Sequence, residues 1–165
     1  MELAPGTLVR DSIRLVRPLG HGSMGSVWVA EHLVLETQVA VKFVHAELVV
    51  TDPVAVKRFE REARSAAKIK SPHVVEIFDA GVTPAGVPFL VMELLSGESL
   101  GDRLQRGHLP LMEAAEIVGQ VARALERAHA AGVIHRDIKP DNIFLCAGDD
   151  GRVHAKVLDF GVAAN

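Results

Sequence analysis

The sequence predicts an α+β fold in which a β-rich half with one helix precedes a helical half. Runs of β-branched residues on either side of a glycine cluster occupy the first part of the chain and are typical of strands. Apolar residues at helical spacing dominate the later part. A short connector, Glu93–Gly97, separates the two parts. With 165 residues, 48% of them hydrophobic, the chain is long enough for one compact domain or for two small lobes that share a cleft.

The first half is expected to be mainly strand. The predicted strands are Ser12–Gly20, Ser26–His32, Gln38–His45, Val74–Ala80 and Val87–Met92. One helix should lie between the third and the fourth of these strands. Asp52 suits its N-cap, Pro53 suits its first turn, and its apolar pattern continues to about Lys70.

The second half is expected to contain two helices, Ser99–Gln105 and Leu111–Ala131. Two short strands, Asn142–Cys146 and Val153–Leu158, should follow them and pair around a GDDG turn. The apolar face of the longer helix is predicted to consist of Leu111, Ala115, Val118, Val121, Leu125 and Ala128.

Composition argues against several classes of protein. The 18 basic and 21 acidic residues give a net charge of −3, which disfavours a general nucleic-acid binder and a polybasic membrane-surface protein. Cys146 is the single cysteine, so no intrachain disulfide can form and a reducing compartment is expected. No apolar run reaches the roughly 18 residues of a membrane span, and the N-terminal residues do not resemble a secretory signal, so we expect a cytoplasmic protein. Apart from His135, the histidines lack zinc-ligand spacing and are expected to be surface or packing residues, namely His21, His32, His45, His73, His108, His129 and His154.

The segment Gly20–Val27 has the pattern GxGxxGxV. Glycines let a backbone turn sharply and bring its N–H groups close to a ligand phosphate, although a glycine-rich hairpin without a ligand is the alternative. A dinucleotide-binding fingerprint needs a helix after the glycines, and a Walker A loop needs lysine after the last glycine. Here a predicted strand follows, and Ser26 occupies the lysine position. The remaining interpretation is a loop between two strands that covers a phosphate.

Lys42 lies inside an apolar strand, although lysine is rarely buried without a partner. Strand alternation puts Ala40 on the same face as Lys42, and a small residue beside a lysine suits a face that receives a flat ligand. The opposite face then carries Val39, Val41 and Phe43. A half-exposed strand whose lysine faces water is the alternative.

The following helix carries two carboxylates, Glu60 and Glu62. Glu60 has mainly polar neighbours at helical spacing, whereas the neighbours of Glu62 are the apolar Phe59, Ala66 and Ile69. A carboxylate on an apolar face needs a cation, and Lys42 is the available one. A solvated pair of Glu62 with Arg58 is the alternative. The basic residues of this region are expected to form a solvated face and not a nucleic-acid site: Lys57, Arg58, Arg61, Arg64 and Lys68.

Residues 135–142 read HRDIKPDN, and the segment Asp159–Gly161 (DFG) follows a predicted strand. Asp137 can accept a proton from an attacking hydroxyl. The amide oxygen of Asn142, together with a second carboxylate, can hold a hard divalent cation. Lys139 adds a positive charge where phosphoryl charge must be offset. A purely structural turn is the alternative, but the joint presence of HRDIKPDN, DFG and the glycine loop argues against it.

These motifs resemble, in their order, the eukaryotic-like (Hanks-type) Ser/Thr protein kinases of bacteria. The order is GxGxxGxV, VAVK, a glutamate within RFEREA, HRDIKPDN and DFG, and the resemblance extends from about Asp11 to Gly161. It implies the protein-kinase-like bilobal fold, an α+β fold with a β-rich N-lobe that has one helix, followed by the first part of a helical C-lobe. The implied boundaries are 1–92 for the N-lobe, 93–97 for the hinge and 98–165 for the partial C-lobe.

The resemblance also implies roles for single residues in phosphoryl transfer from ATP with Mg²⁺. Asp137 would be the catalytic base, and Lys139 would offset charge on the γ-phosphate. Lys42 would hold the α- and β-phosphates and pair with Glu62. The metal ligands would be Asn142 and Asp159. The glycines that would cover the phosphates are Gly20, Gly22 and Gly25, and the residues expected around the adenine are Leu19, Val27, Ala40, Met92, Glu93, Leu95 and Phe144.

The implied partner is a protein with a serine or threonine hydroxyl, and self-phosphorylation is a further expectation. From composition, no nucleic-acid partner and no membrane segment in this chain are expected. Lys139 is typical of the Ser/Thr class, and Arg136 resembles that of kinases switched by activation-loop phosphorylation. A nucleotide-binding pseudokinase or interaction module is the alternative, and a small-molecule kinase of related fold is another. Pseudokinases usually lack one of the residues that correspond to Lys42, Asp137 and Asp159, and all three are present here.

Two features depart from the family pattern. The spacing between Asp137 and Asp159 is longer than expected, with the excess in a surface turn at Ala147–Arg152. The sequence ends at Asn165, soon after DFG, so we expect a truncated kinase domain without the activation segment and the later C-lobe. The apolar face of the helix Leu111–Ala131 should then be partly exposed. Such a chain is expected to bind Mg-ATP weakly and to transfer no phosphate to peptides.

Overall fold

The computed structural model describes residues 3–22, 25–44, 53–148 and 151–160. The chain divides into two compact units, one of Met1–Arg64 with Ile77–Leu94 and one of Ser65–Glu76 with Leu95–Asn165. The segment Ser65–Glu76 therefore belongs to the second unit although it precedes the last strands of the first. The boundaries expected from the family resemblance remain a prediction. Within the described ranges, no helix combines the length and the apolarity needed to cross a membrane.

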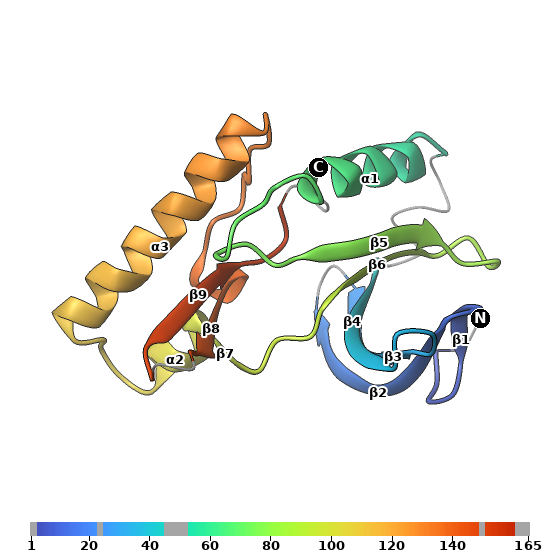
Figure 1. Cartoon of the computed structure of the whole chain (residues 1–165), viewed down its shortest axis with the longest axis horizontal. Coiled ribbons are helices and arrows are strands. Elements are labelled where there is room, and N and C mark those ends of the chain that lie inside the picture. The colour runs from blue at the N-terminus through green and yellow to red at the C-terminus, as the bar shows by residue number, and fades with distance from the viewer. Residues whose placement is uncertain (1–2, 23–24, 45–52, 149–150, 161–165) are drawn as a thin grey trace. The chain divides into compact units, whose positions relative to one another are not determined.

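The described part of the first unit contains an antiparallel sheet of six strands in the order β1-β2-β3-β4-β6-β5 (Figure 1). The strands are β1 (Leu8–Arg10), β2 (Ile13–Gly22), β3 (Gly25–His32), β4 (Thr37–Val44), β5 (Ile77–Val82) and β6 (Pro88–Glu93). Helix α1 (Pro53–Ala66) follows β4 in the chain. The predicted helix and strands of this half are confirmed in kind and order, and β1 was not predicted. His45 and Asp52, the predicted strand end and N-cap, lie outside the described residues.

The predicted end of α1 near Lys70 is wrong, because the helix ends at Ala66. The backbone N–H of Lys68 donates to the Ser65 carbonyl, and that of Ile69 donates to the Ala66 carbonyl. These bonds span three residues and tighten the chain into a turn. The turn buries Ile69.

The predicted start of β5 at Val74 is also wrong, because this strand begins at Ile77. Val74 instead forms an isolated parallel bridge with Val157 of the second unit, to which Ser65–Glu76 belongs. The β-branched pair Val74-Val75 does form strand-like contacts, but with a different partner from the one that its sequence position indicated.

Side chains alternate on β4 and give the sheet two different faces. Ala40 and Lys42 occupy one face, because the residues between and beside them are buried in the core on the other. That core includes Trp28, Val39, Val41, Phe43 and Phe89. Burying each such side chain contributes about 1.5–3 kcal/mol. The predicted alternation is therefore confirmed.

An ion pair joins the two edge strands of this sheet. Arg10 on β1 donates from Nη1 to Oδ2 of Asp79 on β5 at 2.6 Å, although these strands stand at opposite ends of the strand order. The Arg10 guanidinium also lies 5.5 Å from the centroid of the Phe89 ring. The sheet is therefore strongly curled. An exposed pair of this kind contributes at most about 1 kcal/mol, so the enclosed core is the main stabilising element.

The second unit has a three-stranded antiparallel sheet in its described part, in the order β7-β8-β9. Its elements are β7 (Gly97–Ser99), α2 (Leu100–Gln105), α3 (Leu111–Ala130), the 3-10 turn η2 (Pro140–Asn142), β8 (Ile143–Ala147) and β9 (Val153–Val157). Figure 1 shows α3, in orange, alongside β9, in red. The predicted elements are confirmed here. β7 was not predicted, because its sequence Gly-Glu-Ser has no β-branched or aromatic residue.

The buried face of α3 differs from the predicted one. The helix buries Ile117, Gln120, Val121, Ala124 and Ala128. Val121 and Ala128 were predicted correctly, but Leu111 and Val118 are 84% and 66% exposed. Ala115 is also exposed, and Leu125 is half-buried. The face was misplaced because a glutamine, Gln120, lies at its centre, and hydrophobic periodicity does not identify a buried amide.

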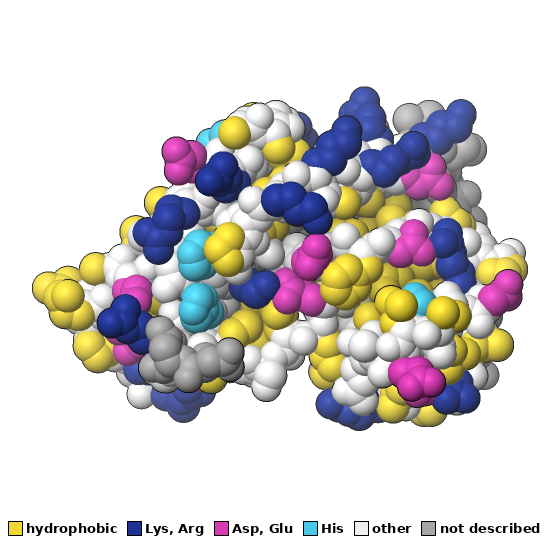
Figure 2. Space-filling view, in the orientation of Figure 1, with side chains coloured by type: hydrophobic (Ala, Val, Ile, Leu, Met, Phe, Trp, Pro, Cys, Tyr) yellow, Lys and Arg dark blue, Asp and Glu magenta, His cyan; other side chains and the backbone are white. Residues whose placement is uncertain are grey.

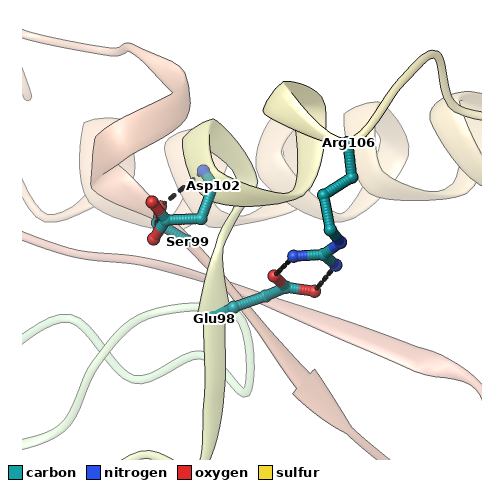
Figure 3. Close-up of polar contacts among 4 residues, drawn as sticks. All are labelled: Glu98, Ser99, Asp102 and Arg106. Carbon is teal, nitrogen blue, oxygen red and sulfur yellow. Dashed lines mark hydrogen bonds and ion pairs between the residues drawn. The ribbon is translucent and has the colours of Figure 1, made fainter.

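The start of α2 is fixed by polar contacts (Figure 3). Ser99 is the N-cap and not the first helical residue, and its Oγ accepts a hydrogen bond from the Asp102 backbone N–H at 3.0 Å. Glu98 accepts two hydrogen bonds from the Arg106 guanidinium at the other end of the helix. The hydrogen bond from Arg106 holds the pKa of the Glu98 carboxyl below its ordinary value.

Gly25 provides a test of this fold. Its φ is +149°, and a Cβ added there would lie 1.8 Å from the Phe43 carbonyl oxygen. We expect Gly25→Ala to lower the free energy of unfolding of the first unit by about 2–4 kcal/mol. The chain has one tryptophan, Trp28, and no tyrosine, so fluorescence in a urea titration follows this unit.

Gly20→Ala is the matched control, because a Cβ there would meet no atom within 4 Å. We expect it to change the free energy of unfolding by less than about 1 kcal/mol. Equal losses in the two variants would contradict the close contact at Gly25.

Candidate functional site

The glycine-rich segment of the first unit joins β2 to β3. Gly22 and Gly25 are register partners at the end of this hairpin, and residues 23–24 lie outside the described part. Gly25 is needed because β4 approaches it closely, whereas Gly20 has open space where a side chain would be. The open backbone at Gly20 is the kind of surface that a phosphate can approach.

Lys42 lies on β4, between β3 and β6, with Val27 and Leu90 as its register partners. It is only 9% exposed, which excludes the alternative of a lysine that faces water. Ala40, two residues earlier, is 5% exposed. A buried ammonium beside a small residue fits the predicted ligand-facing surface.

Glu62 lies on α1 and is half-buried. Its predicted neighbours are buried: Phe59, Ala66 and Ile69. Glu60 instead accepts a hydrogen bond from Arg64 at 3.3 Å on an exposed face, as its polar neighbours predicted. The pairing of Glu62 with Lys42 stays a prediction, and the Arg58 side chain lies outside the described residues.

Basic side chains gather over α1 (Figure 2). The described members of the predicted basic face are all exposed, namely Lys57, Arg61, Arg64 and Lys68. Their exposure fits a solvated helix face.

The residues predicted around the adenine divide between the two units. Those of the first unit are Leu19, Val27, Ala40, Met92 and Glu93, and those of the second are Leu95 and Phe144. Met92 is the register partner of Ala40, so the two lie side by side on adjacent strands. The role of these residues in adenine binding stays a prediction.

The second unit brings three predicted site residues together on one loop. Lys139 Nζ lies 2.8 Å from Asp137 Oδ2. Asn142 donates from Nδ2 to the Asp137 carbonyl at 2.8 Å and to Asp137 Oδ2 at 3.1 Å. This pattern uses the amide nitrogen of Asn142 on Asp137 and leaves the amide oxygen, Oδ1, as a ligand for a hard cation.

Hydrogen bonding sets the charge state of this loop. The hydrogen bond from Lys139, and a smaller one from Asn142, hold the pKa of the Asp137 carboxyl below its ordinary value. The same bond to Asp137, with the nearby charges of Asp141 and Asp159, holds the pKa of Lys139 above its ordinary value. Asp137 is therefore a carboxylate at neutral pH, able to accept a hydrogen bond or a proton.

His135 links this loop to the chain just after β9. Its side chain is buried, and Nε2 lies 2.6 Å from the Leu158 carbonyl oxygen. A carbonyl can only accept, so Nε2 carries the proton, and Nδ1 accepts from the Asp137 backbone N–H at 3.2 Å. The Phe160 ring packs edge-on against His135, with ring centroids 4.8 Å apart. Neither residue was assigned a role from the sequence, although both stand beside a motif aspartate.

Two non-glycine residues of the site have left-handed backbone conformations. The φ angle is +69° at Arg136 and +56° at Asp159. Each such conformation costs about 1–3 kcal/mol and persists only where surrounding contacts enforce it. His135 precedes Arg136 and accepts a hydrogen bond from the Asp137 N–H, and it donates to the carbonyl of Leu158, which precedes Asp159. These contacts enforce the two conformations.

The donor set fits Mg²⁺, which prefers oxygen ligands. The Asn142 amide oxygen and the Asp159 carboxylate are both of this type. The charge of Asp159 acts on Lys139, which places this carboxylate in the same electrostatic neighbourhood as the loop 137–142.

A family model described as "Protein kinase domain" matches residues 13–165. The chain belongs to this family. It is 45% identical over 154 residues to serine/threonine-protein kinase Pkn1 of Myxococcus xanthus, a match that covers 92% of this chain and 22% of Pkn1. It is 46% identical over 151 residues to serine/threonine-protein kinase PknH of Mycobacterium tuberculosis, covering 91% of this chain and 23% of PknH. These relatives confirm the predicted bacterial Hanks-type branch.

The crystal structure of the Mycobacterium tuberculosis PknI kinase domain is similar, with a TM-score of 0.87 and 31% identity. The match covers 99% of this chain and 64% of that chain. It confirms the predicted protein-kinase-like fold. The chain spans about a fifth of the length of the curated relatives that it matches.

The Asp137–Lys139 pair predicts a pH dependence. Because the pKa of Asp137 is lowered in the folded protein, the pair stabilises the fold above the ordinary carboxyl pKa of 3.8, and this stabilisation is lost as pH falls through the lower folded value. In Lys139→Met, the largest cause of the shift is gone, so we expect the pKa of Asp137 to rise toward 3.8. NMR titration of the carboxyl carbon measures it.

Lys70→Met is the control, because Lys70 pairs with Glu76 on the surface and away from this loop. An Asp137 pKa that is the same in Lys139→Met as in the unchanged protein would contradict the assigned pair.

Proposed function

We propose that this chain is part of the catalytic domain of a protein serine/threonine kinase that transfers the γ-phosphoryl group of ATP to a protein hydroxyl. One observation supports this function most directly. The Asp137 carboxylate pairs with Lys139 at 2.8 Å and accepts a hydrogen bond from a candidate metal ligand, Asn142, on the same loop. That loop has a base, a cation and an oxygen ligand within reach of one reacting group.

Asp137 accepts the proton of the substrate hydroxyl as that oxygen attacks. It is a carboxylate at neutral pH, and the hydrogen bond from Lys139 holds its pKa below the ordinary value of 3.8. Asn142 orients it through two hydrogen bonds, one to its carbonyl and one to Oδ2. The base is therefore held in position by its own loop.

Lys139 has a second task in this mechanism. Its side chain is exposed and pairs with Asp137. Its ammonium can offset the charge of the transferring phosphoryl group, and the bond to Asp137 holds its pKa above the ordinary value. The negative Asp137 and the positive Lys139 therefore act in the same reaction, the first as the base and the second as the counter-charge to the phosphoryl group.

Nucleotide and metal binding fall to residues of both units. In the first unit, Gly20, Gly22 and Gly25 offer backbone N–H groups to the phosphates, and Lys42 holds the α- and β-phosphates. In the second unit, Asn142 and Asp159 would hold Mg²⁺, which would supply positive charge to offset that of the phosphates.

The substrate is a protein serine or threonine, and one substrate is the kinase itself. We place the reaction in the cytoplasm, where ATP is available and a single thiol, Cys146, stays reduced. The alternative of a pseudokinase is not favoured, because Lys42, Asp137 and Asp159 are all present.

Two substitutions separate chemistry from binding. We expect Asp137→Asn to lower turnover at least about 100-fold, because it removes the base, while Mg-ATP affinity stays nearly unchanged. Asp159→Asn should instead weaken the Mg²⁺ dependence of nucleotide binding. Radiolabelled phosphotransfer to a generic basic protein, and calorimetry with Mg-ATP, measure the two effects on the natural gene product.

For an activated kinase we expect turnover on the order of 1–100 per second. Transfer by the unchanged protein that does not exceed the Asp137→Asn blank would contradict the proposed function. Loss of nucleotide binding in folded Asp137→Asn would contradict the division of roles.

Lys42→Met tests the phosphate-binding lysine. Methionine keeps the length of the side chain and removes its charge, so we expect the fold to persist and phosphotransfer to fall at least about 100-fold. In a nucleotide-bound crystal structure, Lys42 Nζ should lie within about 4 Å of the Glu62 carboxylate. Lys70→Met is the matched control, with activity unchanged. Full activity in Lys42→Met would remove this lysine from the mechanism.

A further inference from the structure

The outer edge of β9 is the side that faces away from β8. Backbone groups of Val153, Ala155 and Val157 take part in hydrogen bonds on this side. Within the described residues, β9 is at the end of the strand order β7-β8-β9, so no named strand pairs with this edge. An edge strand buried beside a helix needs other partners for its N–H and C=O groups.

Gln120 of α3 supplies the first of these partners. Its Nε2 donates to the Val153 carbonyl at 2.9 Å, and its Oε1 accepts from the Ala155 N–H at 2.6 Å. The side chain is 4% exposed, so both bonds are shielded from water. The C=O of one residue and the N–H of the second residue after it are the two groups that one residue of a parallel neighbouring strand would bond. The carboxamide therefore occupies the place of a peptide group.

The segment around His73 continues the same edge. His73 Nδ1 lies 3.1 Å from the Ala155 carbonyl, the next acceptor along β9. The Val157 N–H donates to the His73 carbonyl at 2.9 Å, and the Val75 N–H donates to the Val157 carbonyl at 3.1 Å. The bridge between Val74 and Val157 is parallel, as the pattern at Gln120 is. One side chain and one short segment together replace a parallel strand.

The next residue of the chain is already part of the site. Leu158 donates from its N–H to the Asn142 carbonyl at 2.9 Å, and its carbonyl accepts from His135 Nε2 at 2.6 Å. Asp159 follows directly. A continuous series of hydrogen bonds thus runs from Gln120, along β9, to the residue that precedes the candidate metal ligand.

We propose that Gln120 is a positioning residue for the metal site. Its carboxamide fixes β9 along the strand direction and thereby sets where Asp159 stands relative to Asn142. The proposal rests on the proposed function, since it concerns the binding of Mg²⁺ with nucleotide.

The chemistry of this position favours an amide over other groups of the same size. Methionine has a similar length but offers neither a donor nor an acceptor to the strand edge. A glutamate carboxylate keeps the acceptor for the Ala155 N–H but has no donor for the Val153 carbonyl. Gln120→Met should therefore remove the hydrogen-bond partner of both the Val153 carbonyl and the Ala155 N–H. Gln120→Glu should remove only the partner of the Val153 carbonyl.

The first measurement is nucleotide binding as a function of Mg²⁺ concentration, in the natural gene product and its Gln120→Met variant. We expect the half-saturating Mg²⁺ concentration to rise about 10-fold or more, as for other residues that orient metal ligands, while nucleotide affinity without Mg²⁺ changes less than about 2-fold. A role confined to stability would lower the melting temperature without changing the half-saturating Mg²⁺ concentration. Glu116→Met is the matched control, because Glu116 lies on the exposed side of the same helix.

The second measurement does not depend on nucleotide. Amide hydrogen exchange at Leu158 reports whether the loss at Gln120 is transmitted along β9. We expect faster exchange at Leu158 as well as at Ala155 in Gln120→Met, a smaller increase in Gln120→Glu, and none in Glu116→Met. If Gln120→Met does not fold, the Gln120→Glu variant carries both measurements.

The outcomes separate the two proposals. Wild-type exchange at Leu158 in a folded Gln120 variant, or an unchanged Mg²⁺ dependence, would overturn the positioning role. If the unchanged protein binds no nucleotide with Mg²⁺, the proposed function fails, and exchange at Leu158 still decides whether Gln120 controls the end of β9.

Discussion

The backbone of Leu158 is the point on which the catalytic half of the site depends. Its carbonyl accepts the Nε2–H of His135, and its N–H donates to the carbonyl of Asn142. The first bond fixes the imidazole so that Nδ1 receives the Asp137 N–H, and the second holds the residue that orients the Asp137 carboxylate. Both ends of the loop 135–142 are therefore tied to one residue at the end of β9. Buried hydrogen bonds of this kind contribute about 0.5–1.5 kcal/mol each, but leaving one partner unpaired costs more.

This anchoring explains how the site can hold unfavourable backbone conformations. Arg136 and Asp159 both have positive φ, and each is adjacent to a residue of the His135–Leu158 hydrogen bond. The edge-on contact of Phe160 with His135 adds apolar burial on the other side of Asp159. Strain of about 1–3 kcal/mol per residue is thus offset by contacts that surround it.

Much of the fold and of the catalytic loop could be predicted from the sequence, because the signals are local. The alternation around Lys42 placed the core face of β4 correctly, and the short-range motif spacing placed Asp137, Lys139 and Asn142 on one loop. Three of the errors have a common physical cause. The apolar face of α3, the start of β5 and the strand β7 are decided by partners distant in sequence. A buried glutamine or a three-residue strand has no periodic signature, so only tertiary contacts reveal it.

The electrostatics of the loop 135–142 and the hydrogen bonds of β9 are linked through Asp159. Lys139 lowers the pKa of the Asp137 carboxyl. Asp137 in turn raises the pKa of Lys139, with smaller contributions from the charges of Asp141 and Asp159. The position of Asp159 therefore matters twice, once as a candidate metal ligand and once as part of the field around Lys139. A residue that sets the position of β9 acts on both, although it contacts neither nucleotide nor substrate in the mechanism proposed above. Gln120 is such a residue, because its two hydrogen bonds lie at the start of β9, which ends two residues before Asp159.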